Sequence, residues 1–144
     1  MRYFVFLSIL LVSLTGCDVQ ANKVSGESQG VNLDLSKIDN VVTSKDNNEK
    51  IKYFNALLVK AENNDPVAQN LVGVVFENGY FNQEKDVKKA IYWYNKAIDN
   101  NNGLAENNMG SLYAHGNGVK QDYKKAYEYY ESAMKKIYLK QLIP

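Results

Sequence analysis

The chain of 144 residues carries one cysteine and one histidine, the side chains best suited to nucleophilic or acid–base chemistry near neutral pH. Cys17 follows an apolar run near the amino terminus, and a lone cysteine leaves no second thiol for a disulfide or a metal site. His115 lies directly before Gly116, where we expect a surface or helix-end position, because no cysteine, serine or paired carboxylate is placed to form a triad or ligand set with it. We therefore expect no enzymatic activity, no metal and no cofactor.

Residues 1–16 have the anatomy of a signal peptide. One positive charge at Arg2 precedes an apolar run of about a dozen residues, and small residues follow. A membrane-spanning helix needs about 20 apolar residues. Asp18 and Lys23 come too soon for such a helix, so the pattern favours a segment that is removed.

The segment Leu14-Thr15-Gly16-Cys17 resembles the bacterial lipobox. The resemblance implies that the Cys17 thiol is diacylated and that the chain is cut before it; an ordinary secretory signal containing a cysteine is the alternative. Two or three acyl chains would hold the protein on a membrane, since each buried methylene contributes about 0.8 kcal/mol. Asp18 resembles a signal for inner-membrane retention in enteric bacteria and slightly favours that membrane, although a solvated linker residue explains it about as well. We expect a periplasm-facing protein of the cell envelope.

Residues 17–45 predict a flexible linker after the lipidated cysteine. They are rich in Ser, Asn, Gly, Gln and Lys, and they show no aromatic residue and no helical period. A flexible coil of this length spans on the order of 30 Å. The folded part is expected to begin at residue 46, where Asp46 and Glu49 have the spacing of a helix cap and its capping-box partner.

Residues 68–133 state nearly the same pattern twice. The pairs separated by 37 residues are Ala68 and Ala105, Gly73 and Gly110, Phe76 and Tyr113, and Gly79 and Gly116. The pairs separated by 36 residues are Asp86 and Asp122, Ala90 and Ala126, Tyr94 and Tyr130, and Ala97 and Ala133. A period in this range is typical of helical-repeat arrays, in which each unit is one helix pair.

Helix signals divide the folded part into a leading helix and two repeats. Asp65-Pro66 and Asn102-Gly103 predict the starts of the first helices, and Asn78-Gly79 and His115-Gly116 predict their ends. The predicted parts are a leading helix at 46–64, a first repeat at 65–101, and a second repeat with the C-terminal helix at 102–144. The fold predicted is all-α: an antiparallel helix-pair solenoid of two full repeats plus a leading helix, after a disordered tether.

Two glycines inside the predicted first helices indicate close packing. Gly73 and Gly110 each cost a helix about 1 kcal/mol relative to alanine. We expect a neighbouring helix or a large ring such as Trp93 to press on the bare backbone there. Trp93 itself is expected to be an internal anchor between units.

These residues resemble the Sel1-like repeat family, relatives of the tetratricopeptide repeats. The second unit carries the family pattern at Ala105, Met109, Gly110, Tyr113, Gly116, Gly118, Val119, Asp122, Lys125, Ala126, Tyr129, Tyr130 and Ala133. The first unit carries it at Ala68, Val72, Gly73, Phe76, Gly79, Asp86, Lys89, Ala90, Trp93, Tyr94 and Ala97, but Phe81 replaces the second loop glycine. The resemblance covers about half the chain, and it implies a helix-pair solenoid that binds other proteins.

A partner protein is expected in the groove lined by the first helices. The positions there that the repeat core does not use are Gln69, Asn70, Val74, Glu77, Glu106, Asn107, Ser111 and His115. Nucleic acid is not expected, because 16 lysines and one arginine balance 16 acidic residues and form no clustered basic footprint.

The leading functional hypothesis is a lipid-anchored adaptor of the cell envelope. An immunity protein that neutralises a secreted, periplasm-acting toxin is the alternative, because small repeat lipoproteins of this kind resemble immunity partners of lipase effectors. The C-terminal helix carries apolar residues on more than one side, including Tyr127, Met134 and Tyr138. This end is predicted either to bind a partner or a second copy, or to fold back and cover itself.

Overall fold

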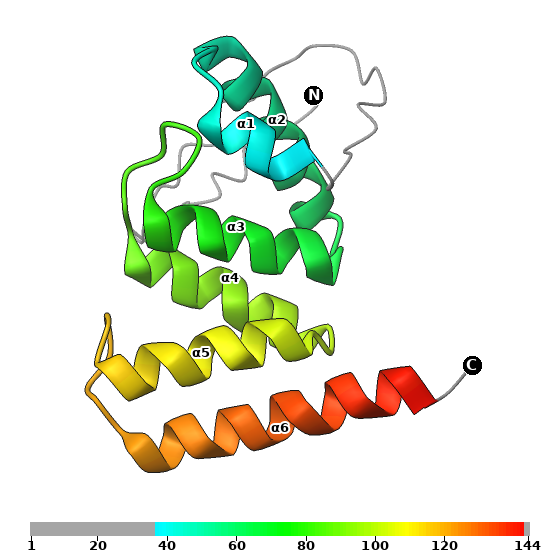
Figure 1. Ribbon diagram of the computed structural model, residues 1–144, viewed down its shortest axis with the longest axis vertical. Helices are drawn as coiled ribbons and strands as arrows, with labels where there is room; N and C mark the ends of the chain where they lie inside the picture. The colour runs from blue at the N-terminus through cyan, green and yellow to red at the C-terminus, as the bar shows by residue number, and fades with distance from the viewer. Residues whose placement is uncertain (1–36, 143–144) are drawn as a thin grey trace, which may run out of the picture. The chain divides into compact units, whose positions relative to one another are not determined.

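The computed structural model describes residues 37–142, which form six α-helices joined by short turns (Figure 1). The helices are α1 (Ile38–Thr43), α2 (Asn47–Glu62), α3 (Pro66–Asn78), α4 (Val87–Asp99), α5 (Gly103–His115) and α6 (Tyr123–Leu142). The described residues contain no strand, and none of their helices has the length and apolar character that crossing a membrane requires. The all-α helical-repeat prediction is confirmed. The predicted signal peptide, Cys17 and most of the predicted linker lie outside the described residues.

Side-chain caps start the helices at the predicted residues. The carboxylate of Asp65 accepts hydrogen bonds from the backbone N–H groups of Val67 and Ala68, both at 2.9 Å, and Pro66 occupies the first turn of α3. The amide oxygen of Asn102 accepts from the backbone of Ala105 at 3.0 Å at the start of α5. These caps satisfy N–H groups that a helix leaves unpaired at its first turn.

The predicted capping box at α2 is half wrong. Asp46 caps the helix by accepting from the backbone N–H of Asn48 at 2.9 Å. Glu49 does not return to the backbone of Asp46; its carboxylate accepts from the hydroxyl of Ser44 at 2.7 Å, and that hydroxyl accepts the Asp46 N–H at 3.1 Å. Ser44 therefore takes the place that the box motif assigns to Glu49.

The linker prediction is wrong at its C-terminal end, because α1 lies inside the range 17–45. Ile38, Val41 and Val42 follow the i, i+3, i+4 spacing of one helix face, and Val41 is buried in a cluster with residues of α2 and α3. A six-residue helix is too short to be stable alone. Packing against α2 holds this helix in place, and three apolar positions at helical spacing are too short a pattern to predict a helix by themselves.

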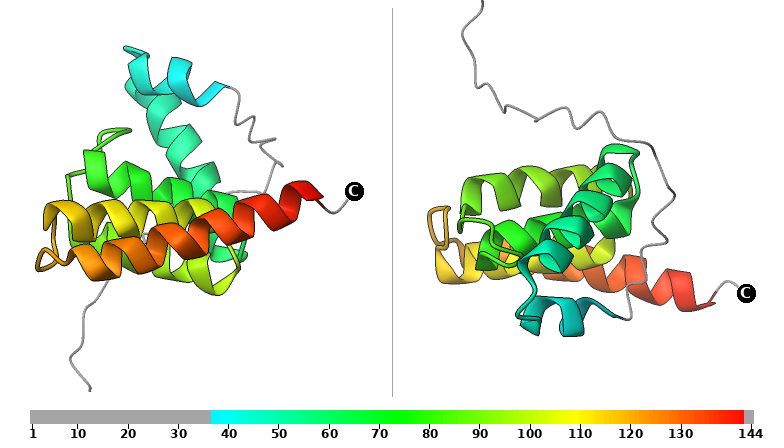
Figure 2. Two further views of the ribbon diagram at one scale, coloured as in Figure 1. Left: turned by 60° about the horizontal axis from the view of Figure 1, so that its bottom comes forward. Right: turned by 90° about the horizontal axis from the view of Figure 1, so that it is seen from above.

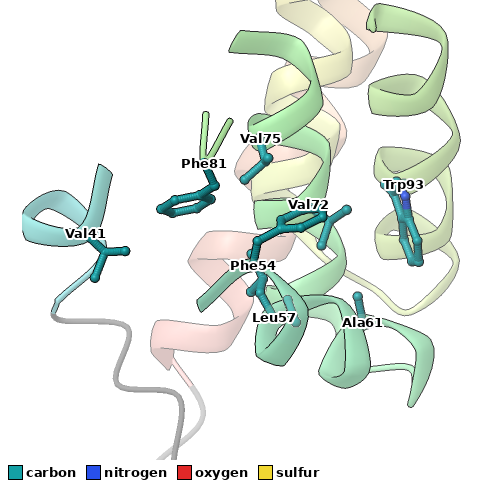
Figure 3. Close-up of a cluster of buried hydrophobic side chains, with 9 residues drawn as sticks. Val41, Phe54, Leu57, Ala61, Val72, Val75, Phe81 and Trp93 are labelled. Carbon is teal, nitrogen blue, oxygen red and sulfur yellow. The ribbon is translucent and has the colours of Figure 1, made fainter. Parts of the chain in front are cut away.

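Two apolar clusters run through the array. The first joins α1 to α4 and contains, among others, Val41, Phe54, Leu57, Val72, Val75, Phe81 and Trp93 (Figure 3). The second joins α4 to α5 and contains Ala90, Tyr94, Ala97, Ala105, Met109 and Leu112. Trp93 is 9% exposed and packs with residues of α2 and α3, so its predicted position as an internal anchor is confirmed.

The glycines inside α3 and α5 each face a tyrosine ring of the paired helix. A Cβ atom built on Gly110 would lie 2.8 Å from Cε1 of Tyr130, and a Cβ on Gly73 would overlap the ring of Tyr94. The pressing rings thus come from α4 and α6 of the same pairs. The suggested ring, Trp93, is wrong. The ring that meets Gly73 is that of Tyr94, whereas Trp93, the residue before it on α4, packs in the first apolar cluster with residues of α2 and α3.

The loops that follow α3 and α5 differ at one residue for a structural reason. Gly118 lies at a φ of 70°, and its bare backbone packs against Val87 of α4. Phe81 takes the corresponding place in the first unit at a φ of 53°, a left-handed conformation that costs a bulky side chain free energy. Its ring is buried in the first cluster, with its centroid 5.4 Å from that of Tyr53, so burial against α2 offsets the strain.

Candidate partner-binding surface on α3 and α5

The eight residues predicted to bind a partner lie on α3 and α5, and six of them take corresponding positions in the two repeats. Gln69, Asn70 and Val74 of α3 correspond to Glu106, Asn107 and Ser111 of α5. Side-chain hydrogen bonds join the two helices: Asn108 Nδ2 donates to Asn70 Oδ1 at 2.9 Å. The cap residue Asn102 also donates to the carbonyl of Pro66 at 2.8 Å. These bonds keep α3 and α5 in register.

Gln69 is fully buried and acts as a tie between helices. Its Nε2 donates to the carbonyl oxygen of Ala61 at the end of α2, at 3.0 Å. Its Oε1 accepts from Nδ2 of Asn100, the residue that ends α4, at 2.9 Å. Gln69 thus satisfies backbone and side-chain groups at two helix ends, and it is not accessible to a partner.

Glu106 occupies the corresponding position on α5 and is 5% exposed. Its Oε1 accepts from Nζ of Lys136 at 2.9 Å and from the hydroxyl of Ser132 at 2.8 Å, which ties α5 to α6. Its Oε2 is buried without a hydrogen-bond partner among the described residues. A buried carboxylate held by one lysine stabilises the helix pair only while both partners remain, because removing either leaves an unpaired buried charge.

Gln69, Asn70 and Glu106 are therefore wrong as partner-binding residues in the folded chain, since all three are buried. Not every helix position outside the repeat core faces solvent. A first helix of a repeat has neighbours on two sides, so a polar residue can face a helix end instead of water. Part of the evidence for this burial is in the sequence. Gln69 and Glu106 are polar residues at corresponding positions of the two repeats, each directly after a core alanine.

Val74 and Glu77 are half-buried at the edge of this surface. Val74 packs against the second apolar cluster. The Oε2 atom of Glu77 accepts a hydrogen bond from the Tyr94 hydroxyl at 2.6 Å. Burial, and then this hydrogen bond to a carboxylate, raise the pKa of the Tyr94 hydroxyl far above its usual range. Both residues present only part of their surface to solvent.

Asn107, Ser111 and His115 form the accessible edge of α5, with Ser111 half-buried and the other two exposed. His115 Nδ1 lies 2.8 Å from the backbone oxygen of Ser111 and 3.5 Å from its hydroxyl. A carbonyl oxygen only accepts, so Nδ1 carries the proton and cannot take one from Ser111. Ser111 therefore lies beside His115 in an arrangement that supplies no base for its hydroxyl.

One further feature of the repeats was not found from the sequence. Lys125 Nζ lies 5.2 Å from the ring centroid of Tyr113, and Lys89 lies 5.2 Å from that of Phe76 at the corresponding place. An open hollow of about 550 Å³ adjoins the second pair and is lined by Tyr113, Val119, Lys120, Gln121, Asp122 and Lys125. The recurrence of lysine and ring at fixed spacing was the available signal. Within residues 37–142 no three His, Cys, Asp or Glu side chains are grouped as metal ligands would be.

Helix pairs held together by corresponding contacts in successive units define a helical-repeat solenoid, the class to which the tetratricopeptide-related proteins belong. Residues 66–102 and 103–136 match the family model of the Sel1 repeat. The chain is a Sel1-like repeat protein, and the predicted family resemblance is confirmed. Proteins of this kind generally mediate protein–protein interactions, and the fold is typically a non-catalytic scaffold.

The chain is similar to a plant protein and to two bacterial proteins of known structure. Over 90 residues it is 36% identical to the ERAD-associated E3 ubiquitin-protein ligase component HRD3B of Arabidopsis thaliana, a match that covers 62% of this chain and 14% of the relative. A Sel1 repeat protein from Oxalobacter formigenes superposes with a TM-score of 0.57 at 36% identity, covering 60% of this chain and 35% of that one.

The second solved structure is a protective antigen present in uropathogenic Escherichia coli strains, which displays an SLR fold. It superposes with a TM-score of 0.54 at 29% identity and covers 65% of this chain. This chain spans 14% of the length of the plant relative and 35% and 19% of the two solved chains. The similarity therefore concerns the repeats.

Proposed function

We propose that this protein binds another protein along the exposed edge of α3 and α5, and that a lipid on Cys17 holds it in the bacterial cell envelope. The proposal of a binding edge rests on one observation: some polar residues of these helices hold the fold together, and others are free to contact a partner. Gln69, Asn70 and Glu106 hold neighbouring helices in place, while Asn107 and His115 remain exposed beside the half-buried Ser111.

The buried ties make this edge a pre-organised surface. The bonds from Asn108 to Asn70 and from Asn102 to Pro66 set the spacing of α3 and α5 without using the exposed side chains. A surface ordered before binding loses less conformational entropy when a partner docks. Amide, hydroxyl and imidazole groups on α5 supply donors and acceptors to a partner, and the half-buried Val74 of α3 supplies apolar area.

The partner can be tested by capture from envelope extracts with the full chain. Asn107→Ala combined with His115→Ala should reduce recovery of the partner at least tenfold, because both exposed side chains are lost while the buried ties stay. Asn55→Ala is the matched control, since Asn55 is an exposed asparagine of α2 outside this surface. The melting temperature should stay unchanged in all three proteins.

Equal recovery by the double variant and by the wild type would reject the α3–α5 edge as the contact. The nature of the captured protein separates the two roles that the sequence allows. A component of envelope assembly or signalling fits the adaptor, and a secreted toxin fits the immunity protein.

The lipid anchor is supported by the segment Leu14-Thr15-Gly16-Cys17 and by the anatomy of residues 1–16. Replacing Cys17 with serine removes the thiol to which the lipid would be attached, so the variant should leave the membrane fraction. Separation of membranes after a high-salt wash measures this. Retention of Cys17→Ser in the membrane pellet would refute the anchor without bearing on the α3–α5 edge.

A further inference from the structure

The outer side of α6 repeats the side of α4 that binds the next unit. In α4, Val87, Ile91 and Ile98 pack against the cluster shared with α5, and the backbone of Gly118 in the following loop lies against Val87 and Ile91. The residues 36 positions later are Tyr123, Tyr127 and Met134 of α6. These positions keep large apolar side chains although the chain supplies no further described unit to cover them.

These side chains are open to solvent in the monomer. Tyr123 is 71% exposed, Tyr127 67%, Met134 58% and Tyr138 60%. We call these four residues the α6 seam. In Figure 1, α5 lies along one side of α6, and Figure 2 shows that α6 continues past the start of α5. The alternative that this end folds back on itself is excluded as far as Leu142, because α6 is one uninterrupted helix.

The spacing of the α6 seam is symmetric along the helix. Tyr127 lies as many residues before the midpoint between Tyr130 and Glu131 as Met134 lies after it. Tyr123 and Tyr138 are placed symmetrically about the same midpoint. When two such helices pack antiparallel about a two-fold axis at that midpoint, Tyr127 faces Met134 of the other copy, and Tyr123 faces Tyr138.

We propose that a second copy of this chain occupies the α6 seam, so that two molecules pair through antiparallel α6 helices. In a heptad pattern Tyr123 takes a d position, Tyr127 and Met134 take a positions, and Tyr138 takes the flanking e position of a helix pair. A two-fold contact must complement itself, and this sequence does so without any second surface. The facing groups suit each other, because sulfur–aromatic and aromatic–aromatic contacts are both favourable. The inference needs neither the lipid anchor nor a partner on α3 and α5.

The size and charge of the seam define the strength of the dimer. Three mostly exposed tyrosines and a methionine from each copy would bury a total of about 1,000 Å², taking roughly 150 to 250 Å² for a whole aromatic side chain. This area is at the lower limit for a specific interface, so we expect a dimer in the micromolar range. Beside the seam, Lys124 of one copy comes near Lys135 of the other, but Lys135 is paired with Glu131 of its own helix at 3.2 Å, so the charges there largely balance. Added salt should therefore change the pairing little.

Sedimentation of the full chain in a mild non-ionic detergent tests the proposal. We expect a reversible monomer–dimer equilibrium that depends little on salt. Tyr127→Gln combined with Met134→Gln should weaken it at least tenfold, because these residues face each other twice in one dimer. Leu104→Gln is the matched control, since Leu104 is 56% exposed on α5 outside the seam and should leave the equilibrium unchanged. Equal melting temperatures for the variants show that the fold is kept.

Crosslinking tests the symmetry itself. In a chain carrying Cys17→Ser, a short bismaleimide should join two copies through Glu131→Cys, which lies at the proposed axis. The same reagent should not join copies through Asn107→Cys, which lies on α5.

Three results would overturn the proposal. They are a chain that stays monomeric up to hundreds of micromolar, a dimer that survives the double glutamine substitution, and equal crosslinking at positions 131 and 107. A monomer whose α6 seam binds an added amphipathic peptide belongs to the first of these results. It would assign the seam to a different protein.

Discussion

Contacts between a glycine and a tyrosine set how closely the two helices of each pair approach. Gly73 meets the ring of Tyr94, and Gly110 meets the ring of Tyr130, so one contact recurs in both units. The glycines lose helix propensity, and the rings gain a flat backbone surface on which to pack. The same arrangement buries the Tyr94 hydroxyl near Glu77.

Gly110→Ala should destabilise the protein by about 1 to 3 kcal/mol, because overpacking outweighs the roughly 1 kcal/mol that alanine adds to a helix. The new Cβ would lie 2.8 Å from Cε1 and 2.9 Å from Cδ1 of Tyr130. Thermal unfolding measures the change. Adding Tyr130→Leu should remove most of the penalty of Gly110→Ala, and a single variant that melts above the wild type would contradict the contact.

The Tyr94 hydroxyl should make the fold sensitive to alkali. Burial and the hydrogen bond to Glu77 raise the pKa of Tyr94 in the folded state, whereas an unfolded tyrosine titrates near pH 10. The protonated Tyr94 hydroxyl therefore contributes to the free energy of unfolding. This contribution is fully present below about pH 10 and is lost as the pH rises above it. Tyr94→Phe lacks this group and should be less stable at neutral pH by about 0.5 to 1.5 kcal/mol.

Melting temperatures of the wild type and Tyr94→Phe from pH 7 to pH 11 check this prediction. The difference between the two proteins should narrow above about pH 10, where the wild type begins to lose its advantage. Returning the wild type to pH 7 should restore its melting temperature, which controls for irreversible damage. Parallel curves over the whole range would show that the Tyr94 hydroxyl is not protected by the fold.

At the scale of the elements, Trp93 on α4 holds the leading helix to the first repeat. It shares a cluster with Phe54 and Leu57 of α2 and with Val72 of α3 (Figure 3). Trp93→Ala should reduce the free energy of unfolding by about 3 to 5 kcal/mol, which is a large part of the total stability of a small domain.

Circular dichroism during denaturant unfolding measures this loss. Tyr92→Ala is the control, because Tyr92 is the adjacent residue and is 54% exposed. It should change the stability by less than about 1 kcal/mol. If Trp93→Ala unfolds at the same denaturant concentration as Tyr92→Ala, Trp93 does not join the two parts.

Helix boundaries were predictable because their causes are local. Asp65, Asn102, Gly79 and Gly116 act within one turn of their own helix, so their types and spacing were sufficient. The role of Gln69 was not predictable in this way, because its partners are the carbonyl of Ala61 and the side chain of Asn100 on other helices. The helix α1 was not predicted for the same reason, since Val41 is held by the first apolar cluster and not by its neighbours in sequence.

For the molecule as a whole, the C-terminal turns of α6 should be separable from the fold. The start of α5 at Gly103 packs on Ala133, Lys136 and Ile137, so the residues after Ile137 extend past it. Deleting residues 138–144 should shift the melting temperature by less than about 4 °C, which corresponds to less than 1 kcal/mol.

The same deletion removes Tyr138 from the α6 seam and should weaken self-association in sedimentation experiments. Lys120→Ala, an exposed residue in the loop before α6, is a control that should affect neither measurement. A large fall in melting temperature would show that the last turns of α6 support the fold, in disagreement with the packing of α5 on α6.

Extensive helix packing in residues 37–142 occurs only between consecutive helices: α1 with α2, α2 with α3, and so on to α6. Such a chain has a low contact order, and proteins of low contact order fold quickly because few loops must close before contacts form. Each helix can also dock on the one before it as the chain lengthens. We therefore expect folding to keep pace with synthesis from the amino terminus, with α6 the last element to be added.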